Sequence, residues 1–375
     1  MLFIKKIIGL LDLLIPKKNM SVFIANKSDV SNNIEFYNYL LYKNKYKVFW
    51  IATNKYLVKK NQFYLYSFKG LWLVLRSKNL FLCHDSLTFL KSNHRNIFNF
   101  WHGIGLKKMG FLINENYKSN NLKKYFFFLC SNIDQMEFSS AFGLNPNQIK
   151  ITGLPRNDKL FNTELQKANL KKLNNFLKIN IKFKKIFFYL PTFRENVRKN
   201  KNKNKNFFLF DDFNYDKLVS TLKKNNVLLF VRLHPYEDRH FKKFTNSYNI
   251  FNINDSLLNK INLDIYDFLG SVDCLITDYS SVAFDYMLLD KPIISVIPDI
   301  KIYSSDRGLL LEPFNFWLPG KIISTFDSFL SLLSKDYIYN DEDWKKHKLM
   351  KSIRHKYQDN KSCERIYNII KNDIK

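Results

Sequence analysis

The segment CLITDYSSVAFDYMLLDKPIISVIPD, residues 274–299, contains the pattern that decides the fold. A short apolar run at 274–277 is followed by a polar turn, a helical pattern and a second apolar run at 292–299. Both apolar runs are continuous instead of alternating, which is typical of strands in a parallel sheet that helices cover on both faces. The segment therefore predicts a strand, helix and strand unit of an α/β fold.

Similar apolar runs recur along the chain, with amphipathic helical patterns between them. The runs of the first set lie at 21–25, 47–52, 80–84, 97–102, 125–130 and 149–153, and those of the second at 184–193, 227–235, 274–281 and 292–299. One helical pattern begins at the capping residue Ser131 and ends at Gly143. This alternation predicts two Rossmann-like, doubly wound domains of the α/β class.

A length of 375 residues also favours two domains. The polar, Lys- and Asn-rich region 164–183 separates the two sets of runs, so we expect the junction there. The tract at 196–206 is of low complexity and is expected to be a solvated loop. The predicted organisation is an N-terminal domain at 19–170, a C-terminal domain at 180–340, and C-terminal helices at 343–375.

The formal net charge of +27 indicates an anionic partner, which is a nucleic acid, an acidic membrane surface or a phosphorylated substrate. Lys, Asn, Ile and Phe are abundant together, a composition that AT-rich coding DNA also produces, so the charge alone does not select among these partners. The four cysteines are scattered without a CxxC pair, which indicates neither a disulfide framework nor a zinc site.

The first residues, MLFIKKIIGLLDLLIPKKN, contain an apolar stretch that Lys5, Lys6 and Asp12 interrupt and Pro16 ends. It is shorter than the roughly 20 residues needed to span a bilayer. It also lacks a good signal-peptide cleavage site. We expect residues 1–18 to form an interfacial helix with its lysines near anionic headgroups, or else an ordinary packed helix.

Polar residues follow the predicted strands, at the edge where ligands bind in open α/β sheets. Asp278, Tyr279, Ser280 and Ser281 come directly after the run at 274–277, where a helix begins. Free amides at a helix start, together with two hydroxyl groups, can bind a phosphate. The alternative is that Asp278 or Ser280 only caps the helix.

Two further strands end in cationic residues. Arg232 and His234 alternate after a strand and therefore point to one face, where they could bind phosphate oxygens and donate to a leaving oxygen. Thr192 and Arg194 follow the run that begins at residue 184. The alternatives are a surface ion pair for Arg232 and a pair between Arg194 and Glu195.

His102 ends the run at 97–102 and is followed by Gly103 and Gly105. The glycines would let a substrate lie against the backbone. A neutral imidazole at this position could accept a proton from an attacking hydroxyl group, as a general base. The alternative is a structural histidine.

Five segments in this order resemble those of the CDP-glycerol glycerophosphotransferases, which build teichoic acids and related capsule polymers. The segments are WHGIGLKKMG (101–110), GLPRNDKL (153–160), LPTFRE (190–195), RLHP (232–235) and ITDYSSVAFDYMLLDKPII (276–294). The resemblance extends over roughly 97–361. Where family members often have Thr-Pro after the His-Gly pair, this chain has Ile104 and Gly105, which leaves the acceptor or the polyol open; Asn360 replaces a common glycine.

The resemblance implies a GT-B-like enzyme with two Rossmann-like domains facing a cleft and a C-terminal helix that crosses back to the first domain. Such an enzyme transfers glycerol phosphate or ribitol phosphate from CDP-glycerol or CDP-ribitol to a hydroxyl of a lipid-linked or polymer acceptor, and releases CMP. The implied catalytic residues are His102 and His234. The implied substrate-binding residues are Gly103, Arg156, Thr192, Arg194, Arg232, Ser280, Ser281 and Asp285, of which Asp285 holds the nucleotide or ribose.

Phosphoryl transfer depends mainly on positioning and charge neutralisation, which cationic side chains can supply, so we expect no cofactor and no required metal. The acidic run at 341–343 imitates a metal-binding motif but is expected to open a helix. The expected location is peripheral, on the cytoplasmic face of the plasma membrane, without nucleic acid as a partner. The alternatives are a GT-B glycosyltransferase that uses a nucleotide sugar, and a non-enzymatic basic binding module.

Overall fold

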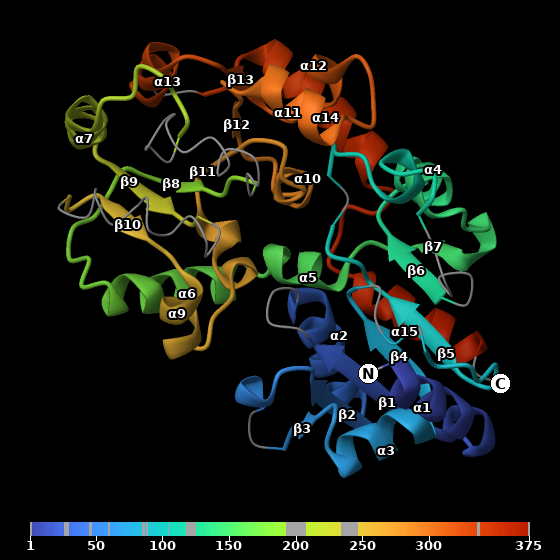
Figure 1. The fold of residues 1–375 in the computed structure, drawn as a ribbon. Helices are drawn as coiled ribbons and strands as arrows, with labels where there is room; N and C mark the ends of the chain where they lie inside the picture. The colour runs from blue at the N-terminus through green and yellow to red at the C-terminus, as the bar shows by residue number, and fades with distance from the viewer. Residues whose placement is uncertain are drawn as a thin grey trace. The chain divides into compact units, whose positions relative to one another are not determined.

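The computed structural model describes residues 2–25, 30–44, 47–58, 61–84, 87, 89–103, 105–117, 125–192, 208–233, 247–335 and 338–373. The chain divides into two compact units. The first unit comprises Met1–His102, Met109–Lys159 and His355–Lys375, and the second comprises Gly103–Lys108 and Leu160–Arg354. Each unit contains its own parallel sheet with helices beside it, as the α/β prediction requires (Figure 1).

The first unit has a parallel sheet in the order β3-β2-β1-β4-β5-β6-β7. Its strands are β1 Lys18–Ala25, β2 Lys47–Ala52, β3 Phe63–Tyr64, β4 Ser77–Leu82, β5 Asn96–Asn99, β6 Tyr125–Leu129 and β7 Ile149–Ile151. Its helices are α1 Leu2–Leu14, α2 Val30–Lys43, α3 Phe68–Arg76, α4 Asn132–Phe142, α5 Pro155–Asp158 and α15 Ser362–Asp373. The strand order reverses between β1 and β4, as in a doubly wound dinucleotide-binding sheet.

An aromatic core fills one face of this sheet. Phe23 of β1 stacks on Phe81 of β4 with ring centroids 4.4 Å apart, and Phe98 of β5 stacks on Phe81 at 5.1 Å. Helices α2 and α15 cover these rings, with Phe36 and Ile366 buried among them. Burial of such a side chain contributes about 1.5–3 kcal/mol, so α15 is part of the first unit's core and not an appendage.

The start of α15 is fixed by a buried carboxylate at the end of α5. Asp158 accepts the backbone N–H groups of Ser362 and Cys363, at 2.9 and 2.8 Å. Burial raises the pKa of Asp158, and these two donors act in the opposite direction. The predicted return of the C-terminal helix to the first domain is therefore confirmed, and Asp158 fixes the start of that helix.

The second unit has a parallel sheet in the order β10-β9-β8-β11-β12-β13. Its strands are β8 Lys185–Tyr189, β9 Val227–Val231, β10 Ile250–Asn252, β11 Cys274–Thr277, β12 Ile293–Val296 and β13 Lys321–Ile323. Its helices are α6 Thr163–Phe176, α7 Tyr215–Lys224, α9 Asp255–Lys260, α10 Val282–Met287, α11 Ile300–Arg307, α12 Phe314–Trp317, α13 Phe326–Leu333 and α14 Asp341–Arg354. The order again reverses once, here between β8 and β11.

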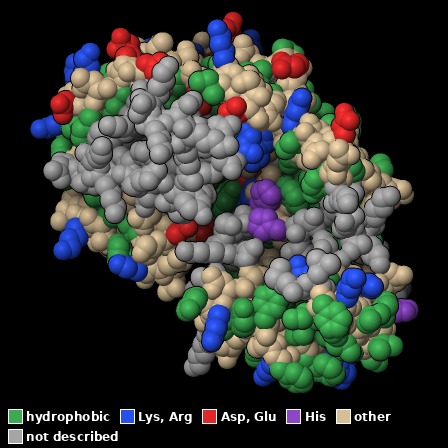
Figure 2. Space-filling view, in the orientation of Figure 1, with side chains coloured by type: hydrophobic (Ala, Val, Ile, Leu, Met, Phe, Trp, Pro, Cys, Tyr) green, Lys and Arg blue, Asp and Glu red, His purple; other side chains and the backbone are tan. Residues whose placement is uncertain are grey.

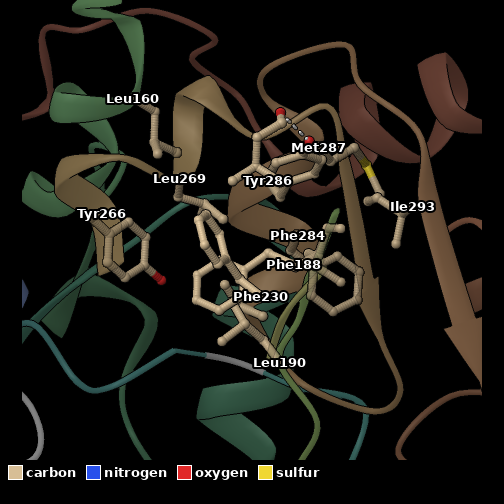
Figure 3. Close-up of a cluster of buried hydrophobic side chains, with 14 of the residues drawn as sticks. Leu160, Phe188, Leu190, Phe230, Tyr266, Leu269, Phe284, Tyr286, Met287 and Ile293 are labelled. Carbon is tan, nitrogen blue, oxygen red and sulfur yellow. Dashed lines mark hydrogen bonds between the residues drawn. The ribbon is translucent and has the colours of Figure 1, made fainter. Parts of the chain in front are cut away.

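The boundaries of the units differ from the predicted ones. Leu160 is buried in the second unit's core together with Leu269 (Figure 3), and Gln166 of α6 donates to the carbonyl of Tyr266 at 2.6 Å. The second unit therefore begins at Leu160, before the predicted junction at 164–183, and it extends through α14 to Arg354. The segment Gly103–Lys108 also belongs to it, because Leu106 is buried in the same core.

Two sequence predictions concern α1 and the start of α14, and the structure confirms the second of them. In α1 the large apolar side chains of Phe3, Leu10 and Leu14 are exposed, whereas Asp12 is fully buried. The acidic run at 341–343 opens α14, where the amide of Asp343 donates to the side chain of Asn340 at 2.8 Å, so its predicted position at a helix start is confirmed. Within the part of the chain that the structure describes, no helix has the length and apolar character to cross a bilayer.

Candidate active site

His102 is presented by a backbone turn that few residues adopt. Trp101 before it has φ 51°, and Gly103 after it has φ 113°. The positive φ of a tryptophan costs free energy, so the surroundings must hold it in place. Asn99 accepts the N–H of Trp101 at 2.8 Å, and Asn32 donates to the Trp101 carbonyl at 3.3 Å. The turn fixes the half-buried imidazole beyond the carboxyl end of β5.

Two rings lie against that imidazole. The indole of Trp101 stacks on His102 with centroids 4.6 Å apart, and the ring of His84 lies 5.1 Å away. His84 comes just after β4, the strand next to β5, and its carbonyl accepts from Asn99 at 3.1 Å. The apolar run at 80–84 predicted His84 at the end of a strand but did not indicate a site residue. Its position after β4 could have indicated this, because the carboxyl ends of neighbouring parallel strands lie at the same edge of a sheet, where ligands bind.

Arg156 lies in α5, where burial and two hydrogen bonds define its position. Its guanidinium Nη1 donates to the carbonyl of His102 at 3.1 Å, and its backbone N–H donates to Asn32 at 3.1 Å. Asn32 thus contacts both Trp101 and Arg156. In the structure Arg156 supports the turn that carries His102; substrate binding by its side chain stays a prediction.

In the second unit, the predicted anion-binding residues lie where the strand order reverses. Asp278 follows β11 and accepts the backbone N–H of Thr192, which follows β8, at 2.8 and 3.0 Å. The N-cap of α10 is Ser281, and its side chain makes no capping hydrogen bond. The alternative that Asp278 or Ser280 serves only as the helix cap is therefore not what the structure shows.

The glycine-rich segment after His102 packs against this same turn. A Cβ atom on Gly105 would lie 3.3 Å from the carbonyl oxygen of Tyr279 and 3.8 Å from the amide nitrogen of Ser281. The segment continues beside residues 308–310, since Leu310 donates to the carbonyl of Leu106 at 2.8 Å. Along the chain, only two residues separate His102 from Gly105.

Lys107 brings a cation to this region. It is half-buried and pairs through its backbone with Leu309. Burial lowers the pKa of Lys107, the nearby Arg307 lowers it further, and Asp278 acts in the opposite direction. The sequence did not predict that residues 107 and 307 lie near one another, because no pattern within one segment indicates it.

The remaining predicted residues have the following positions. Arg232 forms an ion pair with Asp255 at 2.6 Å, which is the alternative considered for it. Asp285 is buried in α10 and accepts from the hydroxyl of Tyr266 at 2.7 Å. Phosphate binding by Arg232 and nucleotide binding by Asp285 stay predictions. Arg194 and His234 lie outside the described residues.

The chain is similar to known proteins over most of its length. A family model described as CDP-Glycerol:Poly(glycerophosphate) glycerophosphotransferase matches residues 10–372. The teichoic acid glycerol-phosphate primase of Bacillus subtilis is 29% identical, over 85% of this chain and 79% of that protein. The teichoic acid ribitol-phosphate polymerase TarL of Staphylococcus aureus is 28% identical over 71% of this chain, but the match covers only 46% of TarL.

Solved structures of the wall teichoic acid polymerase TagF share the fold. One TagF variant has a TM-score of 0.78 and 21% identity, covering 100% of this chain and 94% of that chain. A TagF structure with CDPG has a TM-score of 0.77 and 22% identity, covering 99% of this chain and 93% of that chain. At this level of identity the likeness shows the fold alone.

Proposed function

Because this chain belongs to the CDP-glycerol:poly(glycerophosphate) glycerophosphotransferase family, we propose that it transfers a polyol phosphate from a CDP-polyol donor to an acceptor hydroxyl and releases CMP. The acceptor is the hydroxyl of a lipid-linked or polymer chain, in the synthesis of a teichoic-acid-like or capsule polymer. The observation that carries the proposal is the presentation of His102 at a strand end by a strained turn, directly before the segment that packs on Tyr279 and Ser281.

In this reaction the acceptor oxygen attacks the β-phosphorus of the donor, and the bond between that phosphorus and the CMP oxygen breaks. His102 accepts the proton of the attacking hydroxyl group, a role that contributes about 10²–10⁴-fold to rate. Ser280, Ser281 and the amides beside them hold the diphosphate, and Gly103 leaves room for the substrate. Arg194 and His234 are predicted to contact the same diphosphate, and His234 to protonate or stabilise the leaving group.

The proposal is tested by incubating the purified protein with CDP-glycerol, CDP-ribitol and a panel of nucleotide sugars, and measuring the released nucleotide and the product mass. We expect CMP from a CDP-polyol. Release of UDP or GDP from a nucleotide sugar, without CMP from either CDP-polyol, would instead favour the glycosyltransferase alternative. Product mass also gives the polyol and the number of units added, which matters because the chain spans about half or less of three related ribitol-phosphate polymerases.

The proposal includes an anionic membrane surface as a partner, because an apolar face is exposed on the first unit. Phe3 and Leu14 of α1 are 73% and 77% exposed, and Phe68 of the neighbouring α3 is 87% exposed. Figure 2 shows apolar side chains gathered at the bottom of the view, where Figure 1 draws α1 and α3. Lys5, Lys6, Lys69 and Arg76 belong to the same two helices. An amphipathic helix that combines apolar and basic side chains binds anionic lipid surfaces.

The contacts that α1 makes within the first unit leave its apolar face exposed. Its Asp12 carboxylate is buried and binds Arg95 and Lys17, so the opposite face of the helix points outward. A CDP-polyol is a nucleotide-activated donor and the acceptor is lipid-linked. We therefore propose a peripheral location on the cytoplasmic face of the plasma membrane.

Replacing Leu10 by Glu is expected to weaken binding to vesicles rich in phosphatidylglycerol by about tenfold, because an apolar contact is lost and a negative charge is added. Leu10 is 55% exposed, so folding is expected to change little. The matched control is Leu349→Glu in α14, where the side chain is 50% exposed on the second unit. Equal sedimentation of both variants with the vesicles would contradict the assignment of this face.

A further inference from the structure

The segments that follow β4 and β5 place two histidines beside one another in the first unit. The ring centroids of His84 and His102 are 5.1 Å apart, and the ring planes are tilted by 36°. Both side chains are half-buried. Imidazole is the side chain whose charge ordinarily changes between about pH 5 and 8, so two groups of this kind are adjacent at the candidate site.

One buried amide side chain holds both of these segments. Asn99 is fully buried, and its Nδ2 donates to the carbonyl of His84 at 3.1 Å while its Oδ1 accepts the N–H of Trp101 at 2.8 Å. The strands are also joined at this level, because the amide of Phe100 donates to the carbonyl of Leu82 at 2.9 Å. The separation of the two imidazoles therefore follows from the pairing of the strands that carry them.

Helices α2, α4 and α5 pack against the turn that carries His102, and each presents a group whose charge stays constant in this pH range. Arg156 of α5 donates to the carbonyl of His102 at 3.1 Å, and its guanidinium stays protonated. The neutral amide of Asn32 in α2 donates to the carbonyl of Trp101 at 3.3 Å, and the ring of Phe138 in α4 packs on the Trp101 indole. An imidazole beside His102 differs from these groups, because it can gain or lose a proton.

Two imidazolium rings at this separation repel one another. Once one ring holds a proton, a proton is expected to bind to the other about tenfold less tightly, as for partly solvated charges about 5 Å apart. The pair therefore keeps a single proton over a wider pH range than two independent histidines would. While His84 holds that proton, His102 is neutral and can act as a base. This repulsion acts whatever further groups contact either ring, as long as the charge of those groups is constant.

We propose that His84 is a positioning residue of the transfer reaction: its imidazole lies against that of His102 and, when protonated, keeps a second proton off it, so that His102 remains a neutral base as the pH falls. The inference rests on the proposed function, in which His102 accepts the proton of the acceptor hydroxyl group. It deepens that function, because it identifies the residue that sets the acid limit of the base. The proton that His84 holds comes from solvent, and the proton of the acceptor goes to His102.

The test is a pH titration of the full-length protein with isotope-labelled histidines, followed by NMR. The His102 signal is identified by its loss in His102→Gln. We expect His84→Gln to raise the pH at which His102 is half-protonated by about 0.5, because a tenfold effect on the second proton is divided between the two rings. His84→Lys keeps a cation beside His102, so in that variant we expect half-protonation at a lower pH than in the wild type. A side chain that only packed against His102 would not give opposite directions for the two variants.

The matched control is His94→Gln, at an exposed histidine of the first unit, which should leave the titration of His102 unchanged. A melting curve for each variant shows that it is folded. In assays of CMP release, the loss of kcat/KM caused by His84→Gln is expected to be about twofold larger at about pH 5.5 than at about pH 8.5. The same His102 midpoint in the wild type, His84→Gln and His84→Lys would overturn the inference.

The two measurements separate this inference from the proposed function. If His84→Gln moves the His102 midpoint but the wild-type protein releases no CMP from a CDP-polyol, the coupling of the two imidazoles stands and the base role of His102 fails. If CMP is released and neither variant moves the midpoint, the proposed function stands and the role of His84 fails.

Discussion

His102→Ala is expected to lower kcat for CMP release on the order of 10³-fold, which is the range for loss of a general base. The affinity for the CDP-polyol is expected to change little, because the diphosphate is assigned to groups of the second unit. His102 is half-buried and its own turn is held by Asn99, Asn32 and Arg156, so the variant should remain folded. Steady-state kinetics and nucleotide binding measured on the same preparation distinguish the two effects.

The control is His94→Ala, which makes the same substitution at an exposed histidine of the first unit. The His94→Ala variant should release CMP at the wild-type rate. A rate for His102→Ala within about twofold of wild type would show that this imidazole takes no proton in the slow step. In that case its strained turn would need a different explanation.

Asp12→Ala is expected to have the largest effect on stability. The Asp12 carboxylate is fully buried and binds Arg95, Lys17 at 3.0 Å, and the backbone amides of Lys91 and Ser92 at 2.9 and 2.8 Å. Its removal leaves the buried guanidinium of Arg95 without its carboxylate, and breaking such a pair costs about 3–5 kcal/mol. For a unit of this size, a loss of that magnitude lowers Tm by about 10 °C.

Thermal unfolding followed by circular dichroism checks this expectation, with Asp216→Ala as the control. Asp216 is exposed in the first turn of α7, where a carboxylate contributes less than about 1 kcal/mol. The double variant Asp12→Leu, Arg95→Met removes both charges and should be less destabilised than the two single variants together. Additive losses would contradict the assignment of the effect to an unpaired charge.

Long apolar runs predicted the strands well, whereas three of the four shortest described strands were missed and only β7 was predicted. The run at 47–52 coincides with β2, and the start of the opening segment coincides with β11. The strands β3, β10 and β13 have two or three residues each and were not predicted. So short a strand has no period of its own, and its conformation is set by hydrogen bonds to the neighbouring strand.

The candidate site was also predicted only in part from the sequence. The sequence predicted the strand-end positions of His102, Thr192 and Ser281, because a strand end is a local feature. It did not predict that His84 lies beside His102 or that Arg307 lies near Lys107. Those proximities follow from sheet order and from pairing between distant segments, which no local pattern contains.

The docking of α15 on Asp158 has a consequence for synthesis of the protein. The first unit's sheet is complete in the nascent chain once residue 151 has emerged, yet α15, which covers its Phe-rich face together with α2, is translated only after the whole second unit. Until then the part of that face which α15 covers is exposed on the ribosome, where exposed apolar surface favours aggregation. A premature stop before Ser362 should therefore harm the N-terminal half more than the C-terminal half, although the missing residues come last.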